Sequence, residues 1–480
     1  MSWFRTLPLV LLVCLGAAPR LAAAERPNIL FIYTDDQAAW ALGASGNEQA
    51  ITPHMDRLAR EGAYLKNAFT TTPVCSPSRA SLLFSRYGSE QQITDWIHPR
   101  ESRGVNPQWT TFPECLAAAG YATGLIGKWH LGHKQPEHHP TQHGYQSFVG
   151  FLDGGTSSKN PVLEKHGEPQ KYTGLTADIL GDEAIALIKA HKEGPFFLSL
   201  HHRAPHRPWL PVADEDWEPY KNLDPKIPNP DYPGLLVEKV KRSMREYLAS
   251  VRSVDRNLGR ILEVLDEEEL ADNTVVILTS DHGYNMGHHG IWHKGNGHWI
   301  VENPPAAQKN IPRGQRPNMY DRSLRAPALV RWPGKIAAGT VIDETISNLD
   351  WYPTLVAIGQ GMLPEDETIR GHNFLPLLRG ESIDDWDNDL YAEYSTKHQS
   401  RTHMRAYRTP QWKLVRDFLN EGRDALYDLQ NDPAETTNLI DDPRPEVQQV
   451  VEQLHARILE NMRKVDDPVL RMVSGRKGSE

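Results

Sequence analysis

Several short apolar runs along the chain end at clusters of polar residues. These runs, each with the polar residues that follow it, are Asn28–Thr34 before Asp35 and Asp36, Thr274–Ser280 before Asp281 and His282, and Pro195–Leu200 before His201 and His202. Unbroken runs of β-branched and aromatic residues predict strands that are buried on both faces, as in parallel α/β sheets. Ligands bind to such sheets at the carboxyl ends of the strands. The pattern therefore predicts one sheet edge where carboxylates and imidazoles meet, an arrangement suited to a metal-centred active site.

Segments with helical periodicity alternate with strand-like runs from about residue 26 to about residue 380. The expected helices are Met55–Glu61, Ser78–Phe84, Ala177–His191, Glu238–Leu265 and Leu349–Ile358, and two further expected strands are Ala122–Gly127 and Ala328–Arg331. This alternation predicts an α/β fold with a doubly wound, mostly parallel central sheet flanked by helices. We place this domain at residues 25–385.

After about residue 380 the pattern changes to short extended segments followed by one helix. The extended segments are Asp389–Tyr394, Met404–Tyr407, Trp412–Val415 and Ala425–Asp428, and the helix is expected near Glu446–Val465. We predict a smaller C-terminal α+β subdomain at residues 386–480, with a small antiparallel sheet and a helix. Two long loops, His201–Pro233 and Gly283–Asn318, interrupt the first domain, and loops of such length are often functional.

Composition narrows the possible partners and the location. The 480-residue chain has a formal net charge of −10, a pI near 6.1 and no block of Lys and Arg, which argues against a nucleic-acid partner. Residues 1–24 resemble a secretory signal peptide, with Arg5, the apolar stretch Leu7–Gly16 and the small residues Ala22–Ala24 at a cleavage site. That stretch is too short to span a membrane, and no later segment is long and apolar enough. We expect an exported protein, periplasmic or secreted, without a membrane anchor.

Only Cys75 and Cys115 remain after the signal peptide, so disulfides do not build this fold. Cys115 lies in the helix-like stretch Thr111–Gly120 and is expected to be a buried thiol, with a single structural bridge as the alternative. Cys75 stands on a Ser/Pro turn at a helix start. Taken alone, it is either an ordinary cysteine or a thiol nucleophile activated by the helix N-terminus and by Arg79.

The segment C-S-P-S-R at Cys75–Arg79 resembles the signature at which the sulfatase family converts cysteine into formylglycine. Further family landmarks appear in the family's order at Pro27–Asp36, Gly120–Gly132, Ala204–Pro208, Ser280–Gly283, Tyr320–Pro327 and Leu426–Leu439. The resemblance covers nearly the whole chain after the signal peptide. One departure is Leu83–Arg86, which reads L-F-S-R where the family usually has L-T-G-R.

The resemblance implies how residues 25–385 act as a catalytic domain. A hydrated formylglycine at position 75 attacks sulfur with one hydroxyl, and loss of the proton from the other then expels sulfate. The implied metal ligands are Asp35, Asp36, Asp281, His282 and residue 75 itself. Oxygen-rich donation favours Ca²⁺. The imidazole of His282 makes the set softer and leaves Mn²⁺ or Zn²⁺ as less favoured alternatives.

The resemblance also assigns roles to side chains around residue 75. Arg79 lies against the formylglycine, Lys128 and Lys294 hold the sulfate, His130 assists deprotonation of the second hydroxyl, and His206 protonates the leaving oxygen. His201 and His202 are expected to support or pack against the site. Conversion of Cys75 implies a maturation enzyme as a partner.

Selection of the alcohol that carries the sulfate is expected to come from loops. Candidates are Gln92–Arg103 with Trp96 and His98, His133–His143, Arg203–Trp217 and His298–Gln315. Their Trp, His and Arg residues suit a sulfated carbohydrate attacked in an exo manner, although ordinary loop packing explains them equally well. A phosphonate or phosphodiester hydrolase of the related alkaline phosphatase superfamily is the first alternative, and a non-catalytic binder of sulfated glycans is the second. Neither the sugar nor the oligomeric state is predicted by the sequence.

Overall fold

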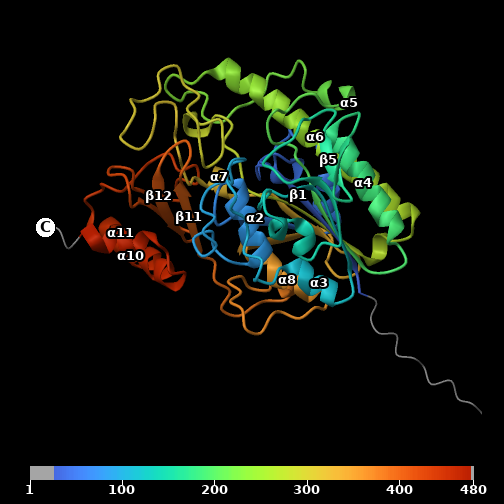
Figure 1. The fold of residues 1–480 in the computed structure, drawn as a ribbon. Coiled ribbons are helices and arrows are strands. Elements are labelled where there is room, and N and C mark those ends of the chain that lie inside the picture. The colour runs from blue at the N-terminus through green and yellow to red at the C-terminus, as the bar shows by residue number, and fades with distance from the viewer. Residues whose placement is uncertain (1–25, 477–480) are drawn as a thin grey trace, which may run out of the picture.

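The structure, a computed structural model, describes residues 26–476 and is built around a ten-stranded sheet (Figure 1). Its strands are β1 Asn28–Thr34, β2 Ala63–Phe69, β3 Ala122–Lys128, β4 Ser147–Phe151, β5 Val162–Lys165, β6 Glu168–Lys171, β7 Phe196–His201, β8 Thr274–Ser280, β9 Ala328–Arg331 and β10 Thr340–Ser347. Their order across the sheet is β10-β2-β9-β8-β1-β7-β3-β4-β5-β6. The crossovers confirm the predicted doubly wound α/β architecture.

The centre of the sheet is parallel and its strands end in register. β1 pairs in parallel with β8 and β7, and β3 pairs in parallel with β7 and β4. Thr34 lies opposite Ser280, and His201 lies opposite both Tyr33 and Gly127. The residues that follow β1, β8, β7 and β3 therefore emerge at one edge. β9 runs antiparallel to β8 and β2, and the hairpin of β5 and β6 adds an antiparallel margin.

Helices cover both faces of this sheet (Figure 1). The helices of this part of the chain are α1 Pro53–Glu61, α2 Cys75–Phe84, α3 Phe112–Ala118, α4 Thr176–Ala190, α5 Asp214–Trp217, α6 Val237–Glu267, α7 Asp321–Leu324, α8 Trp351–Ile358 and α9 Leu375–Leu378. Short 3₁₀ turns lie at Gly43–Ser45, Pro136–His138, Pro140–Gln142, Ala271–Asn273 and His288–Gly290. One apolar core joins the sheet to α2, α3 and α8, and another joins it to α1, α4 and α6.

The sequence of β1 shows why the central runs are apolar throughout. Phe31 and its alternate neighbours face the core under α2, α3 and α8, whereas Leu30 and Ile32 face the core under α6. Successive side chains of a strand point to opposite faces, so a strand covered on both faces buries every position. All seven residues of β1 and all seven of β8 are buried.

The C-terminal part forms a separate four-stranded antiparallel sheet. Its strands are β11 Leu390–Thr396, β12 Thr402–Arg408, β13 Trp412–Asp417 and β14 Ala425–Asp428, and its helices are α10 Pro445–Lys464 and α11 Val469–Arg476. The apolar face of α10 packs on this sheet through Val451, Leu454 and Ile458. The predicted smaller α+β unit is therefore confirmed, while the division at residues 385 and 386 stays a prediction.

The structure bears on the expectations for the N-terminus, for membrane spans and for the cysteines. The predicted signal peptide at residues 1–24 lies outside the described residues. In the described part of the chain, none of the helices combines the length and apolarity needed to cross a bilayer. Cys75 and Cys115 are both buried and free, so the predicted buried thiol at Cys115 is confirmed and the alternative of a bridge between the two is wrong.

Candidate active site

Cys75 is the first residue of α2, and the end of the sheet anchors this helix terminus. The Ser78 hydroxyl donates to the Asp281 carbonyl oxygen, directly after β8. The Ser76 hydroxyl accepts a hydrogen bond of 2.9 Å from the Ile97 backbone N–H. The Cys75 side chain is only 3% exposed. The helix start is therefore held over the sheet edge at which the parallel strands end.

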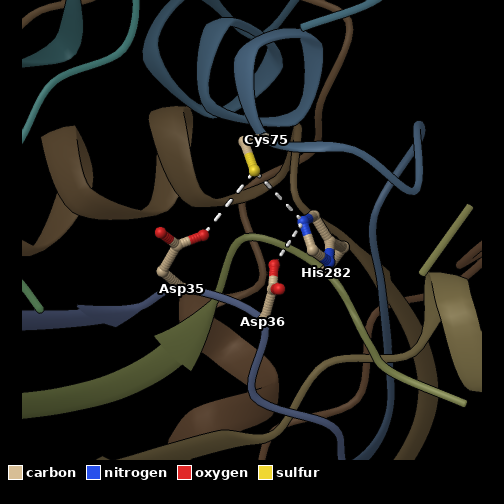
Figure 2. A group of neighbouring side chains, drawn as sticks. All are labelled: Asp35, Asp36, Cys75 and His282. Carbon is tan, nitrogen blue, oxygen red and sulfur yellow. Dashed lines mark hydrogen bonds and ion pairs between the residues drawn. The ribbon is translucent and has the colours of Figure 1, made fainter. Parts of the chain in front are cut away.

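The Cys75 thiol points at the polar residues that follow β1 and β8, as Figure 2 shows. Its Sγ lies 3.6 Å from Asp35 Oδ1 and 3.6 Å from His282 Nε2. Asp35 and Asp36 follow β1, and His282 follows β8 by two residues. The predicted gathering of carboxylates and an imidazole at one sheet edge is thus what the register of these strands produces.

Four of these side chains form a group suited to a metal ion. The ligand atoms of Asp35, Asp36, Cys75 and His282 all lie within 4.8 Å of one another. The Nδ1 of His282 lies 3.0 Å from the Gly283 carbonyl oxygen, which fixes Nδ1 as the donor and leaves Nε2 as a lone-pair ligand. The Asp36 Oδ2 atom is buried and has no hydrogen-bond partner among residues 26–476. Two carboxylates and a neutral imidazole that converge in this way fit a divalent cation.

Asp281 lies beside this group, and its two carboxylate oxygens contact different partners. Its Oδ1 accepts the Asp36 backbone N–H at 3.0 Å and lies 3.4 Å from His282 Nε2. Its Oδ2 lies 3.1 Å from the Nε and 3.0 Å from the Nη2 of Arg79. Arg79 also stacks over the Tyr33 ring at 5.0 Å. Arg79 therefore holds the Asp281 carboxylate in place.

Two buried lysines balance the carboxylates. Lys128 Nζ lies 2.7 Å from Asp35 Oδ2, and Lys294 Nζ donates both to Asp36 Oδ1 and to the Cys75 thiol, the latter at 2.9 Å. Burial acts to raise the pKa of Asp35, but Lys128 and the other nearby cations outweigh it and hold this pKa well below its usual range. Lys294 has the corresponding effect on the pKa of Asp36. Both carboxylates are therefore ionised near neutral pH.

The thiol itself is not activated. Burial raises the pKa of Cys75 to about 12, although Lys128 and Lys294 act in the opposite direction. A thiolate is the nucleophilic form of cysteine, and it is scarce at neutral pH when the pKa is this high. The raised pKa therefore argues against Cys75 as an ordinary thiol nucleophile.

Two histidines occupy different depths of the site. His130 follows β3, is buried, and has φ 60°, an uncommon backbone conformation for a residue other than glycine. Its Nε2 lies 3.1 Å from the Ile97 carbonyl oxygen, and its Nδ1 has no hydrogen-bond partner. Burial, and then Lys128, hold the His130 pKa well below its ordinary value, so the ring is neutral. Gly154 permits this ring position, because a Cβ there would lie 2.8 Å from the imidazole.

His206 lies at the rim and is half-buried. Its Nδ1 lies 2.7 Å from the Arg207 carbonyl oxygen, which assigns the Nδ1 proton and leaves Nε2 to face other groups. Burial lowers the His206 pKa, whereas the carboxylates of Asp35 and Asp36 act to raise it. The Asp35 backbone N–H donates to the Ala204 carbonyl oxygen at 3.3 Å, so the loop after β7 that carries His206 meets the same sheet edge.

Some residues that build the site carried no clear signal in the sequence. The Tyr33 ring packs against the Arg79 guanidinium, and the Ser78 hydroxyl links α2 to the residue that follows β8. His201 Nδ1 lies 2.9 Å from the Lys128 carbonyl oxygen and 3.4 Å from Arg79 Nη1, which agrees with its expected supporting role. Tyr33 lies inside the apolar run Asn28–Thr34, so the search for polar residues after each strand did not include it.

The comparisons with known proteins identify the family. The model of the family described as Sulfatase matches residues 27–361. The chain belongs to the sulfatase family. A second family model, described as the C-terminal part of N-sulphoglucosamine sulphohydrolase, matches residues 315–464 of this sulfatase. The protein is thus an enzyme that hydrolyses sulfate esters, and the residues assembled around Cys75 are its candidate catalytic centre.

The sulfatase is similar to relatives with several substrates in their names. It is 27% identical to the N-acetylglucosamine-6-O-sulfatase of Bacteroides thetaiotaomicron, over 90% of this chain and 86% of that protein. It is 30% identical to the steryl-sulfatase of Rattus norvegicus, over 85% and 80% of the two proteins. It is 31% identical to the human N-acetylgalactosamine-6-sulfatase, over 75% and 68%.

Solved structures agree with the fold. One is a protein in complex with its substrate D-glucosamine-2-N,6-O-disulfate, which superposes with a TM-score of 0.78 at 25% identity and covers 92% of this chain and 99% of its own. Another, in complex with k-i-k-neocarrahexaose, superposes with a TM-score of 0.72 at 26% identity, over 92% and 98% of the two chains. The matches extend through both sheets, since they cover nearly the whole of each chain.

Proposed function

We propose that this sulfatase is an exported enzyme that removes sulfate from a carbohydrate in an exo manner, with formylglycine made from Cys75. The observation that carries the proposal is the convergence on Cys75 Sγ of Lys294, Asp35 and His282, at 2.9, 3.6 and 3.6 Å. A buried cysteine with a pKa of about 12 has little use as a thiol in this setting. Formylglycine supplies, as its hydrate, a hydroxyl nucleophile at this position.

We further propose that Asp35, Asp36, Asp281 and His282 hold Ca²⁺ together with residue 75, and that Mn²⁺ or Zn²⁺ is less favoured. The support is the unpartnered Asp36 Oδ2, the lone pair on His282 Nε2 and the predominance of oxygen donors. The ion supplies charge for a sulfate oxygen and lowers the pKa of the nucleophilic hydroxyl. Arg79 keeps Asp281 in place for this role through its two contacts with Oδ2.

Of the remaining side chains, two lysines bind the sulfate group and two histidines transfer protons. Lys128 and Lys294 are buried cations on either side of Cys75, and they stabilise the negative charge of the sulfate group. The Nδ1 of His130, unpartnered in a neutral ring, accepts a proton from a hydroxyl at position 75. His206 stands at the rim, where the leaving oxygen departs, and donates a proton to it.

The substrate class rests on several lines of support. Two relatives are named for N-acetylated hexosamine 6-sulfates, and the structure with a TM-score of 0.78 holds a glucosamine disulfate. The predicted signal peptide suits a substrate outside the cytoplasm, in the periplasm or beyond the cell. Steryl-sulfatases are also relatives, so a steroid sulfate is the alternative that the assay must include. A maturation enzyme that oxidises Cys75 is the implied partner.

Two measurements test the proposal. Mass spectrometry of the peptide that contains residue 75 should show formylglycine in active protein, and Cys75→Ala should lose turnover by about 10³-fold or more, as expected when a nucleophile is removed. Cys115→Ala is the matched control, because this thiol is buried away from the site beside Tyr352. Full turnover in Cys75→Ala would overturn the mechanism.

A substrate panel completes the test. It contains an aryl sulfate, sulfated mono- and oligosaccharides, a steroid sulfate, and phosphate mono- and diesters. We expect release of sulfate from terminal sulfated sugars at the highest kcat/KM. A preference for a phosphodiester would support the first alternative drawn from the sequence, and a preference for the steroid sulfate would reject the carbohydrate assignment.

A further inference from the structure

Three aromatic rings from distant parts of the chain meet beside the candidate active site. The Trp96 ring lies 4.7 Å from the His398 ring and 5.1 Å from the His98 ring, and the two imidazoles lie 5.7 Å apart, all between ring centroids. Trp96 and His98 belong to the segment after α2, whereas His398 lies in the turn between β11 and β12 of the C-terminal sheet. All three are half-buried, so the cluster is open to solvent on one side.

A buried carboxylate ties the two segments together. Asp95 accepts the backbone N–H of Trp96 at 2.9 Å on Oδ1, and those of Lys397 and His398 at 2.7 and 3.3 Å on Oδ2. His398 Nε2 in turn lies 3.0 Å from the Trp96 carbonyl oxygen. The relative position of the rings is therefore fixed by hydrogen bonds across 302 positions of sequence, and it is not the result of loose loop contact.

Ile97, which lies between Trp96 and His98, connects this segment to the candidate active site. Ile97 donates its N–H to the Ser76 hydroxyl at 2.9 Å, next to the nucleophile position. Its carbonyl oxygen lies 3.1 Å from His130 Nε2. The backbone of Ile97, between Trp96 and His98, thus contacts both Ser76, which follows position 75, and His130. A substrate whose sulfate is bound beside position 75 would therefore lie next to this segment.

Each imidazole of the cluster uses one ring nitrogen in a hydrogen bond within the protein. His398 donates from Nε2 to Trp96, and His98 Nδ1 accepts the Arg100 backbone N–H at 3.1 Å. His398 Nδ1 and His98 Nε2 have no hydrogen-bond partner among the described residues. Glu101 Oε2 accepts the backbone N–H of His98 at 2.9 Å, and it lies 3.1 Å from Arg103 Nη2 and 3.6 Å from His398 Nε2. Imidazole nitrogens beside an indole provide both hydrogen bonds for hydroxyls and apolar contact for a ring.

We propose that Trp96, His98 and His398 form the subsite that holds the sugar ring bearing the sulfate, so that the C-terminal sheet contributes directly to substrate selection. This inference rests on the proposed carbohydrate sulfatase function. It adds a residue, His398, that no loop of the first domain supplies, and it explains why a catalytic domain with a complete set of candidate residues carries a second sheet against its active site. Small aryl sulfates lack the hydroxyls that the imidazoles bind.

The experiment compares a sulfated monosaccharide with an aryl sulfate. The sugar is the one that the wild type hydrolyses fastest among N-acetylglucosamine-6-sulfate, N-acetylgalactosamine-6-sulfate and related sulfated sugars, and the aryl sulfate is 4-nitrophenyl sulfate. For His398→Ala and His98→Ala we expect the ratio of kcat/KM for sugar to kcat/KM for aryl sulfate to fall about tenfold or more. The change should appear mainly in KM for the sugar. His191→Ala, an exposed histidine at the end of α4, is the matched control.

A binding measurement separates recognition from catalysis. In the Cys75→Ala background, which forms no formylglycine, titration calorimetry with the same sugar should show an about tenfold higher Kd when His398→Ala is added. His398→Gln retains a side-chain donor that can reach the Trp96 carbonyl oxygen, and it serves if the alanine variant folds poorly, as judged by Tm. It should also weaken sugar binding.

The possible outcomes distinguish this inference from the function on which it rests. If the wild type hydrolyses sulfated sugars but the variants keep the wild-type ratio and Kd, the subsite is wrong and the carbohydrate assignment stands. If the variants lose sugar and aryl sulfate turnover equally, these residues act on the chemistry or the fold, and the subsite is again wrong. If the wild type hydrolyses aryl sulfate and no sulfated sugar, both proposals fall.

Discussion

Lys294 Nζ lies 2.9 Å from Cys75 Sγ, although 219 positions separate the two residues in sequence. The same ammonium group also donates to Asp36, so one buried cation joins the nucleophile position to a candidate metal ligand. The carboxylates and the thiol together act to raise the Lys294 pKa, and they outweigh burial, which acts to lower it. Lys294 therefore stays charged where a sulfate group is expected to bind.

Replacement of Lys294 by methionine tests this relationship. Lys294→Met keeps much of the side-chain volume but removes the charge, so sulfate and the transition state lose a buried cation. We expect kcat/KM to fall by about 10²–10³-fold, the range seen when one stabilising group of this kind is removed. Lys66→Met is the control, because the Lys66 side chain is 46% exposed and pairs with Asp343 at the surface. Equal losses in both variants would show that the effect is general.

Metal removal should affect both activity and stability. Chelation is expected to abolish turnover, and added Ca²⁺ should restore it and raise Tm. Ligand at a hundredfold excess over its Kd stabilises a protein by about 2.7 kcal/mol. In Asp36→Asn the rise in Tm should largely disappear, because this variant replaces the carboxylate whose Oδ2 has no other partner. Asp343→Asn, at a carboxylate that is 73% exposed, should respond to Ca²⁺ as the wild type does.

The loss of kcat on removing a proton donor depends on how much the leaving group needs a proton. 4-Nitrophenolate leaves readily without a proton, whereas a sugar alkoxide needs one. His206→Gln should therefore lower kcat for a sulfated sugar by about 10²-fold and affect kcat for 4-nitrophenyl sulfate far less. This effect on kcat differs from the effect on KM and Kd expected at His398. Uniform loss of kcat on both substrates would exclude His206 as the donor.

The pH dependence of stability has a predictable contribution from Glu393. This buried residue of β11 accepts the Ser89 N–H at 2.5 Å and the Ser89 hydroxyl at 2.8 Å. Burial raises the Glu393 pKa to about 7. The ordinary glutamate value is about 4.3, so the folded state keeps a proton that the unfolded state loses between these values. The resulting stability is complete below about pH 4.3 and is lost as pH rises to about 7.

Replacement of Glu393 by glutamine should remove this loss. A pKa difference of this size corresponds to about 4 kcal/mol of unfolding free energy. We expect Glu393→Gln to lose less stability than the wild type between about pH 5 and about pH 8 in thermal unfolding. Glu421→Gln, at an exposed position in the loop between β13 and β14, is the control. Parallel curves for Glu393→Gln and the wild type would contradict the prediction.

The fully buried central strands β1 and β8 were predictable from the sequence, whereas the partly exposed strands β2 and β10 were not. The expected bounds of Asn28–Thr34 and Thr274–Ser280 agree with β1 and β8. β2 and β10 were missed, because each mixes buried and exposed positions and includes polar or charged residues such as Lys66 and Glu344. The expected helix at Ser78 begins three residues earlier, at Cys75 itself, because local pattern does not show where a helix N-terminus rests on other elements.

By itself, the sequence determined the alternating fold, the sheet edge at which Asp35, Asp36 and His282 gather, and the resemblance at Cys75 that implies formylglycine. These features follow from local patterns, because a strand buried on both faces and a short motif can each be identified from a few consecutive residues. The resemblance placed Lys294 near residue 75, but only the tertiary structure showed its contacts with the thiol and with Asp36. The tertiary structure also paired Asp281 with Arg79 and brought His398 of the second sheet against Trp96. Such contacts depend on how loops and sheets pack across hundreds of positions, and the spacing of residues along a chain holds no record of that packing.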